Sequence, residues 1–153
     1  MSCYNSILVP ASAEVVWNAV SDFHDMSWAP DVVTSLEAVG ETDGHEVGAR
    51  RVLNGVFHET LLSRDASTRT LTYSIDDGPD VVAADAVANY MGTIRVAPVT
   101  LGAETGAFIE WLSVYESPDP DAVFAFCTPI YTALLTSLRA HFEQEGIRRR
   151  RGA

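Results

Sequence analysis

The sequence contains no lysine, so all ten of its basic residues are arginines. This absence excludes Schiff-base chemistry and a phosphate-binding P-loop, because both depend on a lysine amine. Only two cysteines are present, Cys3 and Cys127, and their separation matches no metal-binding or redox motif, so we interpret them as free thiols in a reducing cytosol rather than a disulfide. No basic segment precedes an apolar run at the N-terminus, and no stretch reaches the ~20 apolar residues of a membrane span. We therefore expect a cytoplasmic protein.

The 21 acidic residues give the chain a formal net charge of −11, and this charge is unevenly distributed. Four arginines form a terminal run at residues 148–151, which leaves 21 acidic residues against six arginines, a net charge of −15, in residues 1–147. Such an acidic body repels phosphate backbones and disfavours nucleic-acid binding. We expect residues 1–147 to form one domain and residues 148–153 to form a solvated, disordered tail. Contact of the arginine run with an acidic partner or RNA is the alternative.

The hydrophobic pattern predicts a strand, one or two short helices, six further strands and a long final helix. Ser12 is a suitable N-cap for the first helix, whose apolar face includes Val16, Trp17 and Val20, and a second short helix is expected near residues 22–26. The expected strands lie at residues 4–9, 32–39, 47–53, 56–63, 71–75, 87–99 and 107–115. Strands followed by one helix indicate an antiparallel α+β domain.

Apolar residues at helical spacing mark the final helix, which we expect to end at Gly146. Pro129 leaves two alternatives for its start. Either Pro129 lies inside the helix and kinks it, or Thr128 is the N-cap and Pro129 the first helical residue. The apolar positions are Val123, Cys127, Ile130, Leu134, Leu138 and Phe142.

Two sets of residues, read in order, resemble a known superfamily. The first set is Pro10, Ser12, Val16, Trp17, Val20, Asp22, Phe23, Trp28 and Pro30. The second set is residues 47–51, Glu59, Leu61, Leu62, Leu71, Tyr73, Ile75, Asn89, Tyr90, residues 92–94, Glu110 and Trp111. Together they resemble the SRPBCC superfamily, which includes START domains and pollen-allergen-like folds, and in particular its polyketide cyclase/dehydrase branch.

The resemblance implies a helix-grip fold, in which a curved, seven-stranded antiparallel sheet wraps around the long C-terminal helix and encloses a ligand cavity. It implies no particular reaction, since members range from ligand carriers to cyclases. The loop at residues 79–87 is longer than is usual in this branch, so the shape of the pocket entrance is not carried over.

Asn54-Gly55 is a strong signal for a two-residue hairpin turn, and a turn of this length places Arg50 opposite Glu59. The same hairpin face carries Val52, Phe57 and Leu61, so we take it as the face that lines the cavity. Glu59 is then a partly buried carboxylate beside an arginine. It is either a ligand anchor or general acid/base, or one half of a purely structural ion pair, which is the more common arrangement.

The four histidines predict no metal site. His58 falls on the opposite hairpin face from Glu59, toward solvent or Arg51. His24, His45 and His141 have no ligand spacing with one another or with a carboxylate. We expect neither a bound metal nor a cofactor.

Aromatic side chains with polar tips are suited to lining a site for an apolar ligand, although the same residues also fill cores. The predicted ligand-binding residues are Trp28, Arg50, Phe57, Glu59, Tyr73, Tyr90, Trp111 and Tyr115, with Glu59 and Tyr73 as the candidate catalytic pair.

The sequence therefore predicts a protein that binds a small apolar or aromatic, polyketide-like molecule, with cyclisation or dehydration as its candidate reaction. The alternatives are a non-catalytic carrier or sensor of a hydrophobic ligand and a protein-interaction module. We expect a void above ~300 Å³ between the final helix and the sheet, and a pocket filled by its own side chains would favour the interaction module.

Overall fold

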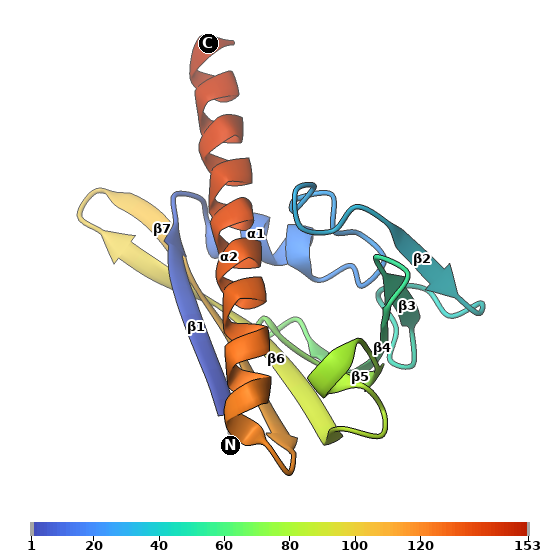
Figure 1. The fold of residues 1–153 in the computed structure, drawn as a ribbon. Coiled ribbons are helices and arrows are strands. Elements are labelled where there is room, and N and C mark those ends of the chain that lie inside the picture. The colour runs from blue at the N-terminus through green and yellow to red at the C-terminus, as the bar shows by residue number, and fades with distance from the viewer. Residues whose placement is uncertain (1, 153) are drawn as a thin grey trace.

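The computed structural model describes residues 2–152, apart from the side chains of residue 101 and residues 147–150. Seven strands form one antiparallel sheet in the order β1-β7-β6-β5-β4-β3-β2, and helix α2 runs across it (Figure 1). The elements are β1 (Ser2–Val9), α1 (Ala13–Val20), β2 (Leu36–Val39), β3 (Arg50–Leu53), β4 (Phe57–Asp65), β5 (Thr70–Asp77), a 3-10 turn (Asp80–Val82), β6 (Ala88–Leu101), β7 (Glu104–Glu116) and α2 (Pro120–Arg151). The predicted helix-grip α+β fold is confirmed.

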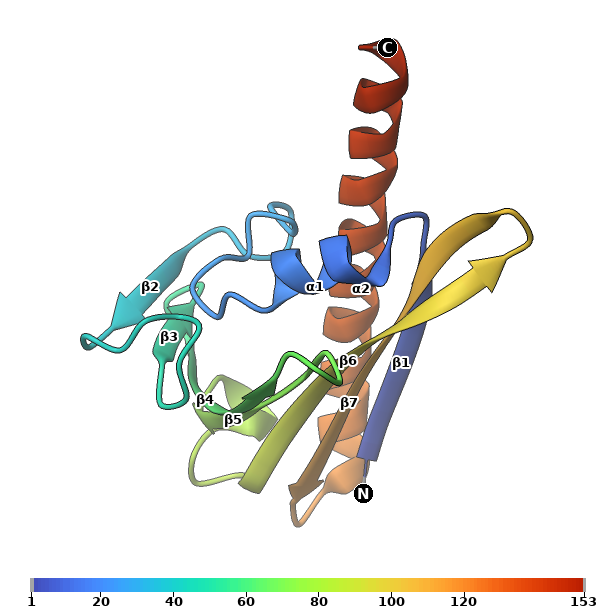
Figure 2. The same ribbon diagram turned by 180° about the vertical axis from the view of Figure 1, so that it is seen from behind.

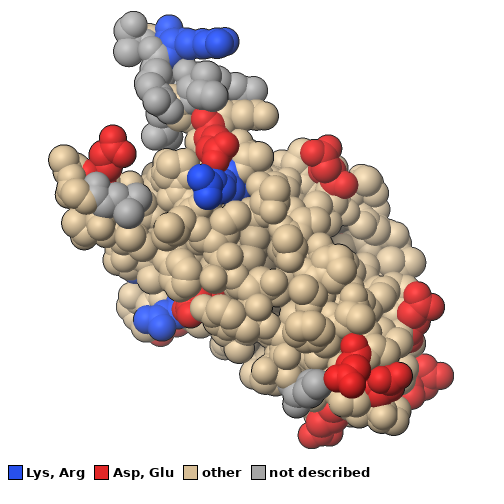
Figure 3. Space-filling model, turned by 60° about the vertical axis from the view of Figure 1, so that its left-hand side comes forward, with Lys and Arg blue, Asp and Glu red and all other residues tan. Residues whose placement is uncertain are grey.

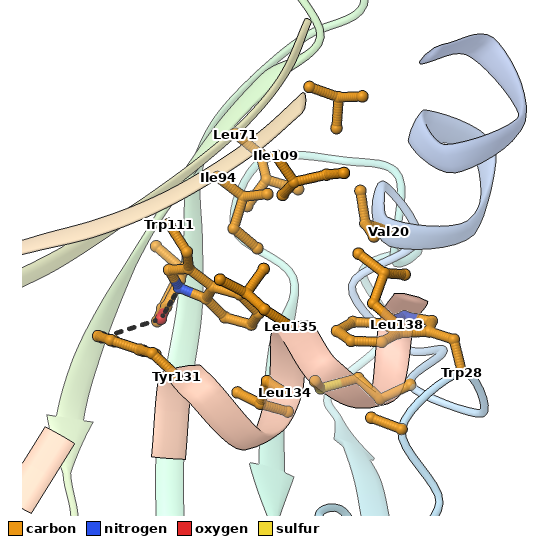
Figure 4. Close-up of a cluster of buried hydrophobic side chains, with 14 of the residues drawn as sticks. Val20, Trp28, Leu71, Ile94, Ile109, Trp111, Tyr131, Leu134, Leu135 and Leu138 are labelled. Atoms are coloured by element: carbon orange, nitrogen blue, oxygen red, sulfur yellow. Dashed lines mark hydrogen bonds between the residues drawn. The ribbon is translucent and has the colours of Figure 1, made fainter. Parts of the chain in front are cut away.

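The main core lies between the concave face of the sheet and α2. Figure 4 shows Trp111 from β7 and Ile94 from β6 facing Tyr131 and Leu135 on α2. All four side chains are buried, each with at most 4% of its surface exposed. Burial of large apolar side chains stabilises a fold by about 1.5–3 kcal/mol each, so this layer is the main attachment between helix and sheet.

Helix α1 forms as the sequence predicts. Ser12 accepts a hydrogen bond from the Val15 backbone N–H at 3.3 Å, and Val16, Trp17 and Val20 are buried on one face. The second helix expected near residues 22–26 does not form. Instead, the Asp22 carboxylate accepts the N–H of His24 at 2.9 Å, which closes a turn and competes with helical hydrogen bonding.

Strand β2 begins four residues later than predicted, because a side chain binds the backbone that precedes it. The Asn54 amide donates to the Val32 carbonyl at 3.0 Å. Its carbonyl oxygen accepts the N–H groups of Thr34 at 2.8 Å and Ser35 at 3.3 Å. These backbone groups are thereby satisfied without a neighbouring strand. Residues 32–35 form a loop beside the hairpin turn.

Helix α2 begins at Pro120, contains Pro129 inside it, and continues beyond Gly146 to Arg151. The predicted end at Gly146 is therefore wrong, while the domain boundary at residue 147 stays a prediction. Residues Pro120–Gly146 are long and apolar enough to cross a membrane by length and composition. This finding corrects the expectation that no segment is long and apolar enough for a membrane span. We interpret α2 as a core helix, because Val123, Leu134 and Leu138 are buried in the hydrophobic core.

Candidate functional site

A small cavity lies between the concave face of the sheet, α2 and the 32–35 loop. Its volume is about 60 Å³, whereas one water needs about 10–15 Å³ on this measure, so the space suits a few waters. The expectation of a void above ~300 Å³ is wrong, because aromatic side chains from the sheet and α2 occupy the space. The lining residues are Met26, Val32, Val33, Arg51, Leu53, Asn54, Phe57, Glu59, Tyr73, Ile75, Tyr90, Trp111, Cys127, Ile130, Tyr131 and Leu134.

The β3–β4 hairpin supplies the charged part of the wall, with a register one residue away from the predicted one. Asn54 and Gly55 both have positive φ (53° and 71°), and the Val56 N–H donates to the Leu53 carbonyl at 3.0 Å, as in a type I′ turn. However, Val56 is an extra residue, so Leu53 pairs with Phe57. Every following pair shifts as well, and Arg51 rather than Arg50 lies opposite Glu59.

Arg51 and Glu59 form a buried ion pair, and each side chain is only 6% exposed. The Arg51 Nε and Nη2 atoms lie 2.8 and 2.7 Å from Glu59 Oε1. Arg51 Nη1 donates to the Phe23 carbonyl at 3.0 Å, and the guanidinium carbon lies 3.8 Å from the centre of the Phe23 ring. Both contacts of Arg51 with Glu59 fall on the Oε1 atom of Glu59. Burial raises the pKa of Glu59, and Arg51 opposes that shift.

A chain of hydrogen bonds crosses the opposite wall from strand β7 to helix α2. Trp111 Nε1 donates to the Tyr73 hydroxyl at 2.9 Å, and the Tyr73 and Tyr131 hydroxyls lie 3.4 Å apart. The Tyr131 hydroxyl also contacts that of Tyr90, which donates to Cys127 Sγ at 3.4 Å. Figure 4 shows Trp111 and Tyr131 converging where these bonds are drawn.

The groups at the two ends of this chain of hydrogen bonds determine which atom donates in each bond. An indole N–H can only donate, and the single hydroxyl proton of Tyr90 is donated to Cys127 Sγ. Tyr131 must then donate to Tyr90, and Tyr73 to Tyr131. Burial raises the pKa of all three tyrosines, so they stay protonated at neutral pH. All three hydroxyl protons are therefore engaged, and the tyrosines present only acceptor lone pairs to the cavity.

Among the described residues, no group of three or more His, Cys, Asp and Glu side chains is placed to hold a metal ion. The absence of a bound metal stays a prediction. Cys3 and Cys127 are both free and buried, and Cys3 Sγ lies 3.2 Å from the Thr128 hydroxyl.

Comparison with known proteins gives the family. Residues 2–143 match the family model described as polyketide cyclase / dehydrase and lipid transport. This chain belongs to that family. Its fold and family are those of helix-grip proteins that bind hydrophobic ligands, and the resemblance to the SRPBCC superfamily is confirmed.

Solved structures of this fold support the assignment. A protein from Nitrosospira multiformis is 40% identical, with a TM-score of 0.89, over 95% of this chain and 99% of its own. A protein from Thermobifida fusca is 24% identical, with a TM-score of 0.76, over 94% and 93%. Norcoclaurine synthase from Thalictrum flavum, in complex with dopamine and hydroxybenzaldehyde, is 21% identical, with a TM-score of 0.69, over 92% and 84%, which shows the fold alone. No protein of curated function matches the chain.

Five of the eight predicted ligand-binding residues line the cavity of this family member: Phe57, Glu59, Tyr73, Tyr90 and Trp111. Arg50 is exposed on the other sheet face, so its predicted place beside Glu59 is wrong. Trp28 and Tyr115 do not line the cavity and pack behind it, Trp28 with its ring centre 6.3 Å from that of Trp111, and Tyr115 stacked on Tyr90 at 5.7 Å. His58 is exposed, as expected.

Sequence reasoning missed Arg51, Asn54 and Tyr131 among the cavity residues. Tyr131 could have been predicted from the sequence, because this residue follows Cys127 by four positions and precedes Leu134 by three, which places it on the buried face of the helix. Arg51 could not, because its direction depends on the extra residue in the hairpin.

Proposed function

We propose that this protein binds a small, largely apolar molecule that donates a hydrogen bond from a hydroxyl group, in the cavity between α2 and the sheet. The observation that supports this most is the arrangement of acceptors in the cavity wall. Both Arg51 contacts of Glu59 fall on Oε1, and the tyrosine hydroxyl protons are all engaged within the wall. A phenol or alcohol finds acceptors there, whereas none of the three tyrosine hydroxyls is free to donate to a ligand that has only a carbonyl.

The size of the ligand follows from the cavity. About 60 Å³ is far below the 300–1,000 Å³ of pockets for drug-sized ligands. A multi-ring, polyketide-like molecule therefore requires movement of the cavity wall. The half-buried Val32 and Val33 and the exposed Asn54 line the cavity on its solvent side, so we place the entrance beside the 32–35 loop. A single-ring ligand is the better match to the cavity as it stands.

Phenol and toluene form a matched pair of probes, because they share size and shape and differ in the hydroxyl group. We expect phenol to bind at least tenfold more tightly by titration calorimetry, and Glu59→Gln to weaken phenol but not toluene. Equal affinities for both probes would show that the polar wall is not an anchor. Native mass spectrometry of protein purified from its own host then identifies the natural ligand.

A second candidate is proton-transfer catalysis at the same site, as in cyclisation or dehydration of a bound ligand. It is favoured by the Glu59 carboxylate and the Tyr73 hydroxyl lining one cavity. Turnover of a hydroxylated aromatic ketone that is lost in Glu59→Gln, with binding retained, would support it. A carrier or sensor keeps binding and shows no turnover, whereas a protein-interaction module, the alternative that the largely filled cavity favours, binds neither phenol nor toluene. The cytoplasmic location and the lack of cofactors and nucleic-acid partners stay predictions.

A further inference from the structure

The outer face of the sheet, which points away from α2, carries an unusual number of exposed apolar side chains. Eight large hydrophobic residues are exposed among the described residues, and four of them lie on this face of β1, β6 and β7. They are Tyr4, Leu8, Met91 and Val114, with exposed fractions of 53%, 45%, 36% and 40%. In Figure 2 this side of β1, β6 and β7 is turned forward, and no helix or loop covers it.

The strand register joins these side chains into one surface. Leu8 pairs with Phe108 and Tyr4 with Leu112 between β1 and β7, and Val114 pairs with Met91 between β7 and β6. Phe108 and Leu112 are half-buried and fill the gaps between their neighbours. We call this surface the outer patch; it consists of Tyr4, Leu8, Met91, Phe108, Leu112 and Val114. Contiguous apolar patches of this kind mark interaction sites.

One positive and one negative side chain interrupt the outer patch. Arg95 on β6 lies directly opposite Glu110 on β7. The Glu110 carboxylate accepts the Tyr4 hydroxyl at 2.7 Å, whereas Arg95 is exposed and forms no ion pair within the described part of the chain. The patch is thus electrically balanced on a protein whose net charge is −11.

These features favour a second copy of this chain as the occupant. Two copies this acidic repel each other, so they meet best through a surface without excess charge. In a two-fold symmetric contact, Arg95 of one copy faces Glu110 of the other, and the reverse pair forms at the same time. A membrane surface fits less well, because the chain has no lysine and is strongly acidic. On the side of the molecule that Figure 3 brings forward, much of the surface is uncharged, and acidic residues cluster at the lower right with a few more scattered above.

We propose that the outer patch is the interface of a symmetric homodimer, held by apolar contact and by two reciprocal Arg95–Glu110 ion pairs. The patch lies on the opposite side of the sheet from the cavity, so the dimer leaves the entrance beside the 32–35 loop open. The interface spans only three strands, so we expect a weak, reversible dimer with a Kd on the order of 10 μM.

Sedimentation velocity of the full chain, from about 1 μM to 1 mM, measures the equilibrium. We expect Arg95→Glu and Glu110→Arg each to raise the Kd at least tenfold, because each places like charges across the interface. Mixed in equal amounts, the two variants should form a heterodimer near wild-type affinity, since the charges are again opposite at both contacts. Arg139→Glu makes the same charge change on α2 and should leave the Kd unchanged. Circular dichroism checks that each variant is folded.

Wild-type protein that stays monomeric throughout this range would overturn the proposal. So would a mixture of the two variants that fails to associate, or equal weakening by Arg139→Glu. Monomeric protein that instead co-sediments with phosphatidylcholine/phosphatidylglycerol vesicles would assign the outer patch to a membrane surface and also refute the homodimer. None of these results bears on the phenol titration, so the proposed ligand site is tested separately.

Discussion

Replacing Arg51 by methionine removes the cation from the buried pair. The Glu59 side chain, which is only 6% exposed, is then left without its partner. Methionine roughly retains the volume of the aliphatic stem, so the main loss is electrostatic. Breaking a buried pair from one side lowers the free energy of unfolding by about 3–5 kcal/mol, because the remaining charge is uncompensated. The neighbouring Arg50→Met is the matched control. Its side chain is exposed, and we expect a change within about 0.5 kcal/mol.

The loss of unfolding free energy in Arg51→Met should also depend on pH, and the electrostatics of the site determine whether it grows or shrinks as the pH rises. Burial raises the pKa of Glu59 in the folded protein, and Arg51 opposes the rise. Without Arg51 the folded-state pKa rises further, so the folded variant binds a proton more tightly than the unfolded chain. Stability is then greatest below the ordinary carboxyl pKa and is lost as the pH rises through the folded-state value, by up to about 1.4 kcal/mol per pH unit. The deficit of Arg51→Met relative to wild type should therefore grow with pH.

Urea unfolding at about pH 5.5, 7.0 and 8.5, followed by tryptophan fluorescence, measures this deficit at pH values above the isoelectric point of about 4.6. In an Arg51→Met, Glu59→Gln double variant, the growth of the deficit with pH should disappear, because the carboxyl group of Glu59 that titrates is gone. A deficit that is the same at all three pH values would refute the reasoning. Arg51 would then stabilise the fold through its hydrogen bond to Phe23 and its packing on that ring rather than through the charge of Glu59.

Three further changes test other contacts of the site by urea unfolding. Gly92→Ala should destabilise by about 1–3 kcal/mol, because its Cβ falls 2.4 Å from the Tyr73 ring; no change would mean that the ring moves freely. Asn54→Gly keeps the positive φ but loses the side-chain hydrogen bonds to the 32–35 loop, which should lower the free energy of unfolding by about 2 kcal/mol. Asn54→Asp should retain part of that stability, and equal losses in the two variants would contradict the role of the acceptor oxygen. Tyr131→Phe breaks the hydroxyl chain and should cost about 1 kcal/mol, and a neutral result would show that the chain adds no stability.

The fold was readable from the sequence because its elements are marked by local signals. The Ser12 cap, the Asn54-Gly55 turn and the apolar stripe of α2 each act over a few residues and appear where the pattern places them. The extent of β2 was not readable, because its start depends on the side chain of Asn54, which lies some twenty residues away in the sequence. Propensity cannot anticipate such a long-range capture of the backbone.

The site was predicted less completely, for a geometric reason. In a strand, a shift by one residue moves each side chain to the other face. The extra residue Val56 therefore exchanges Arg50 for Arg51 in the cavity while the inward direction of Glu59 happens to be preserved. The volume of the cavity was beyond sequence reasoning as well, since it depends on how far Tyr73, Trp111 and Tyr131 turn inward.

The direction of the hydrogen-bond chain also limits what chemistry the cavity can support. With Trp111 donating at one end and Cys127 accepting at the other, the tyrosine hydroxyls have no proton to offer a ligand. Burial raises the pKa of Glu59, whereas the close contacts with Arg51 oppose that shift and favour the ionised form, in which Glu59 is a base and an acceptor. Dehydration needs an acid to protonate the departing hydroxyl, whereas enolate formation before a cyclisation needs only a base. With Glu59 ionised the wall therefore favours proton abstraction over dehydration, and a dehydration step would require either a protonated Glu59 or an opening of the Tyr90–Cys127 bond that reverses the chain.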